Sequence, residues 1–401
     1  MTVGSLTGNP DHLIVDLDGL GQHVFGDAGY AYNGIKNWQN NWTFVESGAV
    51  VEKTLAYYLM GNFEAGIVSG NIGVRVVKSD TKAKGVVATA DGDGTPITDG
   101  MGITNDDFVY KSYGPEYTDV LPSLNLNFEI SPDDIIRFAA AEVIGRPPAG
   151  QLKGGAGSWN GGNAGPNVYN VWSKGSPYLD PFRAKQFDLS FEHYFEDGGA
   201  ITIAAFYKDI DAMVVKKFHP EGPDSAQLFA DLGIEIPAGY SAGAYETFVN
   251  SKGGSIQGYE IAATKTFSSL PGIFSGLGVT ASYSITNSDI EIIGSGQYPN
   301  EIKDIPGLSK NVWSTTVFWT IDQFSAHVNA RYRDGFTNLI TIPGGNETAD
   351  AQDYTVVDAQ MAYGFDNGLE LVLQGNNLTD APNKTAYGEG DLVGEYRTFG
   401  K

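Results

Sequence analysis

Cysteine is absent from this chain of 401 residues, which excludes disulfide bonds and thiol chemistry. No run of about eighteen apolar residues occurs, so membrane-spanning helices are excluded. This absence does not exclude a membrane β-barrel, because the strands of such a barrel show only alternating hydrophobicity and no long apolar run. Basic residues are few: 25 Lys and Arg stand against 48 Asp and Glu, and the net charge of -23 argues against a nucleic-acid partner. The first residues also lack the charged and apolar regions of a signal peptide.

Glycine and aromatic residues, in contrast, are plentiful. The chain holds 52 Gly, 21 Tyr and 21 Phe, which suit a protein with many turns and aromatic girdles. A length of 401 residues exceeds one ordinary domain unless the chain forms a large barrel or a solenoid.

Apolar and polar residues alternate in several segments, as in a strand with one apolar face and one polar face. Near the C-terminus, Leu369, Leu371 and Leu373 fall on one side of such a strand, and Glu370 and Gln374 on the other. The same pattern recurs at 123–130, 277–285 and 324–333. The polar side is too hydrophilic for a packed core and suits a water-filled or plugged lumen. The alternation therefore favours strands whose apolar face contacts lipid.

Short and long connections alternate along the chain. Tight polar turns are expected at 131–134, 196–199, 268–276, 322–323 and 366–368. Between them lie long segments rich in Gly, Asn, Asp, Pro and Ser, at about 80–115, 146–181, 211–245, 286–308 and 335–352. All short turns then lie at one end of the sheet and all long loops at the other. We predict an all-β, antiparallel up-and-down transmembrane β-barrel with about twelve strands, and neither a propeller nor a Greek-key sandwich.

Five phrases carry a resemblance to a known family. In order, they are 117–147, 175–195, 206–210 (FYKDI), 258–267 (GYEIAATKTF) and 375–380 (GNNLTD). From about Val50 onward the chain resembles the C-terminal part of the β-barrel of TonB-dependent outer-membrane receptors, in the branch linked to oligosaccharide uptake. The resemblance implies a bacterial outer-membrane transporter that is not an enzyme. It also places the leucines of 369–373 toward lipid and makes NNLTD the start of the last external loop.

The chain also departs from that family. Nothing in it resembles the N-terminal plug domain or the TonB-contacting box, and the last strand of the barrel is expected to be missing. We therefore divide the chain into an irregular segment, 1–49, which is expected to be an external loop, and a partial barrel domain, 50–401. The expected partners are TonB, the plug domain, outer-membrane lipid and a small solute. An open sheet edge in lipid leaves backbone groups unpaired, so this partial barrel is not expected to insert stably alone.

Aromatic residues among Asn and Gly in two segments are the candidate solute-binding groups, because aromatic faces stack on sugar rings and amides bind hydroxyl groups. The competing interpretation is that they pack loop against loop or lie at the membrane interface. Arginines on the polar face either contact an anionic solute or the plug, or pair with Asp and Glu. The candidate residues are Trp38, Trp42, Trp159, Tyr169, Trp172, Arg137 and Arg331.

Metal and catalytic signals are weak. The acidic segment 91–102 resembles a calcium loop, but Pro96 replaces the turn glycine and Gly102 stands in place of the bidentate Glu, so a solvated loop is favoured. The five histidines form no ligand-spaced cluster, and no catalytic or phosphate-binding motif occurs. We predict no cofactor.

Three functional hypotheses follow. The first is part of a TonB-dependent receptor that imports an oligosaccharide or, as second choice, an iron chelate. The second is a passive porin-type channel, which would lack the plug and the energy coupling. The third is a soluble extracellular carbohydrate-binding β protein, in which the apolar strand faces would be buried between sheets.

Overall fold

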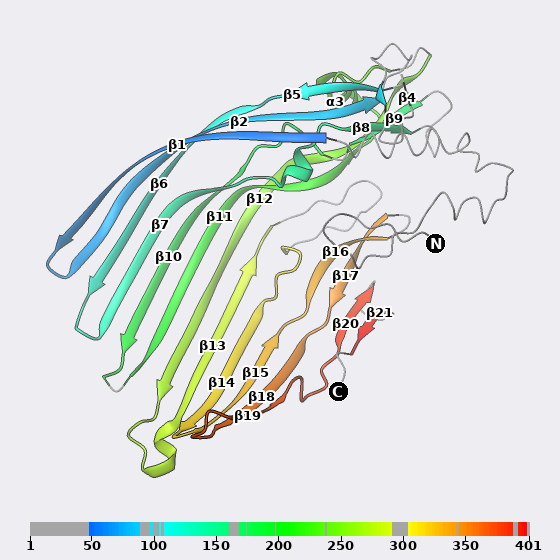
Figure 1. The fold of residues 1–401 in the computed structure, drawn as a ribbon. Coiled ribbons are helices and arrows are strands. Elements are labelled where there is room, and N and C mark those ends of the chain that lie inside the picture. Colours follow the sequence, from blue (N-terminus) through cyan, green and yellow to red (C-terminus); the bar gives the residue numbers. More distant parts are fainter. Residues whose placement is uncertain are drawn as a thin grey trace, which may run out of the picture.

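The computed structural model describes residues 48–88, 97–98, 104–105, 108–159, 168–173, 175–196, 198–236, 239–290, 304–342, 345–387 and 392–398. Among these residues, no helix has the length and apolar character needed to cross a membrane. Most of the described chain lies in one large, curved antiparallel sheet, which we call the wall (Figure 1).

Consecutive strands of the wall pair with their neighbours in an up-and-down order. From one edge to the other, the strands are β1 (Gly48–Ala65), β2 (Val68–Ala88), β6 (Glu116–Glu129), β7 (Asp134–Gly145), β10 (Phe182–Tyr194), β11 (Gly199–His219), β12 (Ser241–Thr266), β13 (Leu277–Ser288), β14 (Asn311–Ile321), β15 (Phe324–Arg333), β18 (Tyr354–Gly364) and β19 (Glu370–Gly375). This confirms the predicted fold class and the expected number of wall strands. β1 begins at Gly48, and the predicted irregular segment 1–49 otherwise lies outside the described residues.

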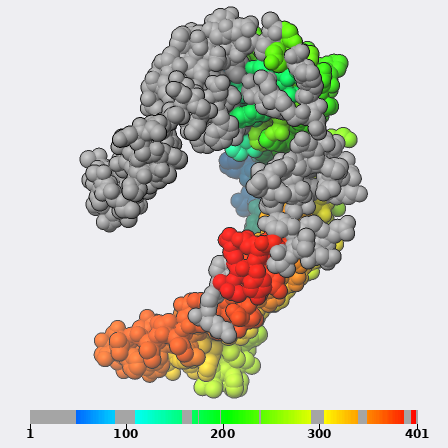
Figure 2. Space-filling view, turned by 90° about the vertical axis from the view of Figure 1, so that its right-hand side faces the viewer, coloured from blue at the N-terminus to red at the C-terminus, as the bar shows by residue number. Residues whose placement is uncertain are grey.

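Short connections gather at one end of the wall, the turn end, and long ones at the other, the loop end (Figure 1). At the turn end, Asp322 and Gly368 adopt positive φ angles of 47° and 83°, as tight turns require. The turn between β12 and β13 is longer and contains a 3-10 helix, η4 (Gly272–Gly276). Among the described strands no pairing joins β1 to β19, and Figure 2 shows the described part of the chain following a curved course.

The long connections contain more regular structure than their composition predicts. β2, β11 and β12 continue into the segments that were expected to be loops. There β2 pairs with β5 (Phe108–Tyr113), and β11 and β12 pair with each other. The remaining elements at the loop end are β3 (Ile97–Thr98), β4 (Thr104–Asn105), η3 (Ala149–Leu152), β8 (Ala156–Trp159), β9 (Val168–Ser173), α3 (Pro223–Asp231), β16 (Phe336–Ile342), β17 (Gly345–Ala351), β20 (Asn383–Tyr387) and β21 (Leu392–Arg397). Gly- and Asp-rich strands resemble loops in sequence, because a polar strand outside lipid needs no apolar stripe.

The two faces of the wall differ as predicted. Leu369, Leu371 and Leu373 are 60%, 65% and 63% exposed, and Phe187, Leu189 and Phe191 of β10 are exposed in the same alternating manner. These leucines are not buried between two sheets, which argues against a soluble sandwich. We call this side the apolar face and the opposite side the polar face. On the polar face, side-chain hydrogen bonds join neighbouring strands; for example, the Asn125 amide of β6 donates to Asn71 Oδ1 of β2 at 2.9 Å.

Strand pairing also forms a closed circuit at the loop end. β8 pairs with the end of β2, β9 pairs with β8 and with the start of β12, and β12 returns through β11, β10, β7 and β6 to β2. The β8–β9 hairpin therefore bridges two wall strands that lie several positions apart.

Candidate functional site: the cap and the polar face

A small hydrophobic core lies at the loop end, built by β5, β8, β9, α3 and the adjoining ends of β2 and β12. We call this region the cap. Phe229 and Tyr245 are almost fully buried in it, with ring centroids 5.7 Å apart. The other members of the core are Val87, Tyr113, Ala156, Tyr169, Val171, Leu232 and Ile234. The cap thus gives the loop end a fixed shape.

Local sequence signals define α3. Pro223 occupies the first turn of the helix, and the Ser225 hydroxyl donates a hydrogen bond to the Gly222 carbonyl (2.9 Å). At the other end, Gly233 adopts a φ of 60° and its N–H bonds Ala230 O (2.9 Å), while Ile234 N–H bonds Phe229 O (2.9 Å). This is a Schellman motif, and its two apolar residues both belong to the cap core.

Burial changes the acidity of the cap tyrosines. Burial raises the pKa of Tyr245 to about 12. Burial also raises the pKa of Tyr113, whose hydroxyl donates a hydrogen bond to Leu232 O at 3.1 Å. Both phenols therefore stay neutral at physiological pH.

The predicted aromatic residues occupy different positions in the cap. Tyr169 is 4% exposed and contacts Phe229 and Tyr240 with ring centroids 6.3 and 6.4 Å apart. Trp172 lies half-buried in β9 opposite Glu246. Trp159 ends β8, and its side chain lies outside the described part, as do Trp38 and Trp42. The fold therefore places Tyr169 as a packing residue, and a solute-binding role for these aromatics stays a prediction.

The two predicted arginines lie on the polar face but far apart along the wall, on β7 and β15. Arg137 Nε contacts Glu192 Oε1 at 2.9 Å, and its Nη1 donates to Asn127 Oδ1 at 2.8 Å. Arg331 Nη1 lies 3.3 Å from Asp358 Oδ2. The structure pairs each arginine with an acidic residue and does not bring the two together in one site.

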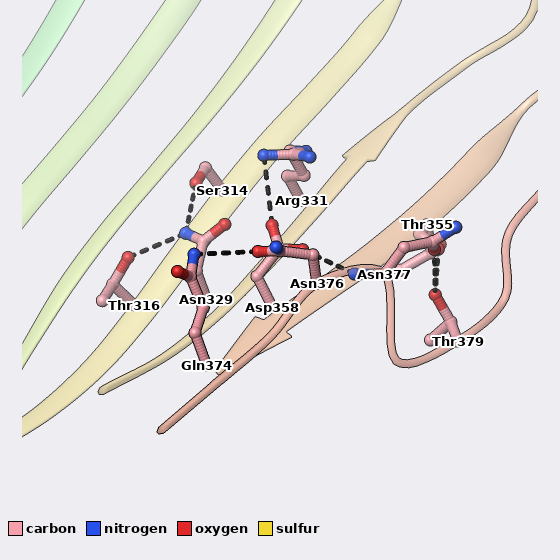
Figure 3. Close-up of polar contacts among 10 residues, drawn as sticks. All are labelled: Ser314, Thr316, Asn329, Arg331, Thr355, Asp358, Gln374, Asn376, Asn377 and Thr379. Atoms are coloured by element: carbon pink, nitrogen blue, oxygen red, sulfur yellow. Dashed lines mark hydrogen bonds and ion pairs between the residues drawn. The ribbon is translucent and has the colours of Figure 1, made fainter. Parts of the chain in front are cut away.

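Asp358 connects Arg331 to the NNLTD motif (Figure 3). Its Oδ1 accepts the Asn377 N–H at 2.7 Å, and the Thr379 hydroxyl donates to Thr355 O at 2.9 Å. Asn377 and Asp380 adopt positive φ angles of 50° and 51°. The motif was predicted to open an external loop: in the structure β19 ends at Gly375, residues 376–382 form no strand, and the chain then pairs as β20 with β17 in a separate sheet.

Amides and hydroxyls dominate the neighbouring polar face. The Asn329 amide donates to Thr316 Oγ1 at 2.8 Å and to Ser314 Oγ at 3.3 Å (Figure 3). At the loop end of β15, Asp334 accepts hydrogen bonds from the Tyr332 hydroxyl (2.6 Å) and from Asn311 N–H (2.9 Å), and the Tyr332 bond is the largest influence that lowers the pKa of Asp334. Such groups can hydrogen-bond a hydrated solute or line an aqueous path.

Metal binding has no support in the described residues, where no group of three or more His, Asp or Glu could hold an ion. The predicted acidic segment 91–102 lies outside the described residues, except for the backbone of β3. Sequence reasoning missed Tyr178, Asp231 and Tyr245, which line a pocket in the cap. The capping signals of α3 could have located Asp231, but only the fold brings the three residues together.

Comparison with known proteins supports a membrane-barrel assignment. The chain is similar to the ferric-catecholate import receptor Fiu of E. coli K12 in its closed form, with 15% identity, a TM-score of 0.57, and coverage of 86% of this chain and 43% of that one. It is also similar to the ferric yersiniabactin uptake receptor FyuA of Yersinia pestis, with 13% identity, a TM-score of 0.54, and coverage of 86% of this chain and 44% of that one. For the unliganded ferric citrate transporter FecA, the identity is 12% and the TM-score 0.54, with coverage of 87% of this chain and 43% of that one. At this identity the likeness concerns the fold.

The chain covers less than half of the length of these receptors. A comparison with curated proteins gives no match. The family model of the TonB-dependent receptor-like β-barrel, however, matches residues 4–378. Members of this family are proteins of the bacterial outer membrane, so the apolar face of the wall contacts lipid. The chain belongs to the TonB-dependent receptor-like β-barrel family.

Proposed function

We propose that the chain forms part of an outer-membrane receptor that binds a scarce solute at the loop end and imports it with energy delivered through TonB. The observation that carries this proposal is the two-sided wall: one face is apolar, and the other bears amides, hydroxyls and paired charges. A wall of this kind separates lipid from a hydrated interior. A plug domain and TonB are the partners that such transport requires.

The solute that we propose is an oligosaccharide. Its hydroxyl groups suit the amides and hydroxyls of the polar face and the aromatic, Asn-rich segments of the loop end. An iron chelate is the second candidate, because the titles of the similar structures name ferric catecholate, ferric yersiniabactin and ferric citrate.

Uptake by whole cells tests this proposal. A Gram-negative strain that carries the gene and a matched deletion strain are given radiolabelled maltodextrin or ferric citrate, with and without a protonophore. We expect gene-dependent accumulation of the sugar that the protonophore abolishes. Accumulation that persists without the proton gradient would favour the passive channel, and gene-dependent accumulation of only the ferric chelate would favour the second candidate.

A further inference from the structure

A pocket of about 400 Å³ opens in the cap, between residues 176–179, α3 and residues 245–250 of β12. Its volume lies in the range of small-molecule sites. Figure 1 shows α3 at the loop end, away from the turns. The pocket therefore lies at the loop end of the wall, where an external solute would arrive.

One side of the pocket is apolar and fixed in position. Leu179 and Leu232 are 4% and 6% exposed, and Leu228 packs against the cap core. Tyr178 stands half-exposed at the rim. Its ring meets Tyr113 edge-on, with centroids 5.8 Å apart, and its hydroxyl donates to Asp231 O at 3.3 Å. This side offers an apolar and aromatic surface to the C–H face of a ring.

Asp231 is the one charged side chain among the described residues that line the pocket. One carboxylate oxygen of Asp231 accepts a hydrogen bond from Gln227 Nε2 at 2.8 Å, which leaves the other oxygen for a ligand. The Asn250 amide is committed to the backbone of Asp180, donating and accepting at 3.0 Å. No lysine or arginine is among the described residues that line the pocket. A carboxylate with no cation beside it in the lining disfavours a negatively charged ligand and favours one that donates a hydrogen bond to Asp231.

Tyr245 provides a second, independent indication of a ligand. It lines the pocket and is 0% exposed, yet its hydroxyl has no hydrogen-bond partner in the described structure. The neighbouring Ser173 hydroxyl bonds Thr247 Oγ1 at 2.6 Å, and Thr247 in turn bonds Gly175 O at 3.5 Å. Buried hydroxyls without a partner are rare, and a ligand oxygen that accepts a hydrogen bond from Tyr245 would satisfy this group.

We infer that this cap pocket binds one neutral, hydroxyl-bearing sugar ring. The ring places its C–H face on Leu228 and Tyr178, donates hydroxyl hydrogens to Asp231, and offers an oxygen to Tyr245. Asp231 sets the specificity, because its carboxylate repels anionic solutes such as ferric citrate. This inference deepens the proposed function and rests on it for its biological role, but the binding itself can be measured separately.

Calorimetric titration of the complete receptor, purified in detergent together with its plug domain, with glucose, maltose, N-acetylglucosamine and ferric citrate tests the pocket. We expect saturable binding of at least one neutral sugar and none of ferric citrate. Asp231→Asn should weaken sugar binding at least tenfold, and Leu228→Trp should abolish it by filling the pocket. Asp224→Asn removes the same charge from the first turn of α3, outside the pocket, and should change the affinity less than twofold. Sugar affinity unchanged by both pocket variants, or tighter binding of ferric citrate, would overturn the inference.

Tyr245→Phe checks that a loss of binding is not a loss of folding. Without ligand this variant should unfold at the same or a higher temperature, because it removes a buried hydroxyl that lacks a partner. The rise in unfolding temperature that the sugar causes in the unchanged protein should shrink by at least half. A full ligand-induced rise in Tyr245→Phe would remove this tyrosine from the site.

The uptake assay separates the two levels of the argument. Sugar binding that depends on Asp231 without sugar uptake would retain the pocket and reject the proposed import. Sugar uptake whose half-saturation is the same in the unchanged protein, Asp231→Asn and Leu228→Trp would retain import and reject the pocket.

Discussion

The cap encloses Phe229 and Tyr245 almost completely, whereas the polar face of the wall leaves Arg331 55% exposed beside Asp358. The cap resembles the interior of a small soluble domain, held by apolar packing and a capped helix. The polar face is held by hydrogen bonds between strands in contact with water. The difference shows that the loop end is shaped by a core of its own and does not merely follow the lipid-bound wall.

Phe229→Ala should give the largest effect and break the cap selectively. Loss of a large buried aromatic costs about 3–5 kcal/mol, and the cavity would lie between Tyr169 and Tyr245. Hydrogen exchange should accelerate in β5, β9 and α3 while the ladder from β13 to β15 stays protected. Phe229→Leu, which keeps most of the volume, serves as the control. Equal acceleration in the cap and the wall would mean that the cap is not a separate unit.

Val328→Arg tests the apolar face. Val328 is 48% exposed on β15, and an arginine facing the middle of the bilayer costs about 2–4 kcal/mol. The neighbouring His327→Arg places the same charge on the polar face and should cost much less. Denaturant unfolding of the complete receptor in lipid vesicles measures both variants. Equal destabilisation would contradict the assignment of the two faces.

Alkaline pH should loosen the cap before the wall. Folding raises the pKa of Tyr245 to about 12 from the ordinary value of 10.0, so the folded cap holds this proton more tightly than the unfolded chain does. Its contribution to stability is complete below pH 10 and declines as the pH rises toward 12. Hydrogen exchange of α3 between pH 9 and 11, corrected for intrinsic exchange, should show this decline, and Tyr245→Phe should reduce it.

The Arg331–Asp358 pair should give the smallest effect. An exposed ion pair contributes about 0–1 kcal/mol, so a double-mutant cycle with Arg331→Met and Asp358→Asn should yield a coupling energy within that range. Asp358→Asn also weakens the bond to the Asn377 N–H, so this single variant should destabilise more than Arg331→Met. A coupling energy well above this range would mean that the polar face is drier than the exposure of Arg331 indicates.

The sequence predicts the wall better than the cap, for a physical reason. Alternation such as Leu369-Glu370-Leu371 and turns such as Asp366-Asn367-Gly368 are local signals, and they predicted strands, faces and turn positions correctly. The cap depends on pairing between β2, β8, β9 and β12, which are distant in sequence, and no local period encodes such contacts. Tyr169 illustrates this: its Asn- and Gly-rich surroundings allow either solute binding or packing between loops, and only the fold shows that its side chain is buried.

For the NNLTD motif, the difference between the prediction and the structure is smaller. The motif predicts the start of an external loop, and Asn377 and Asp380 adopt positive φ angles directly after β19. That the chain resumes pairing as β20 depends on the length and path of β17, which the motif itself does not specify.

The β8–β9 bridge between β2 and β12 has a consequence for the order of assembly. Hairpins of the wall can form one after another from local contacts, but the bridge can close only after β12 has followed, about 150 residues along the chain from β2. Protection of the cap from a protease during membrane insertion would therefore mark a late event. A pulse-chase experiment that follows protease protection of the cap would therefore time the late steps of barrel assembly.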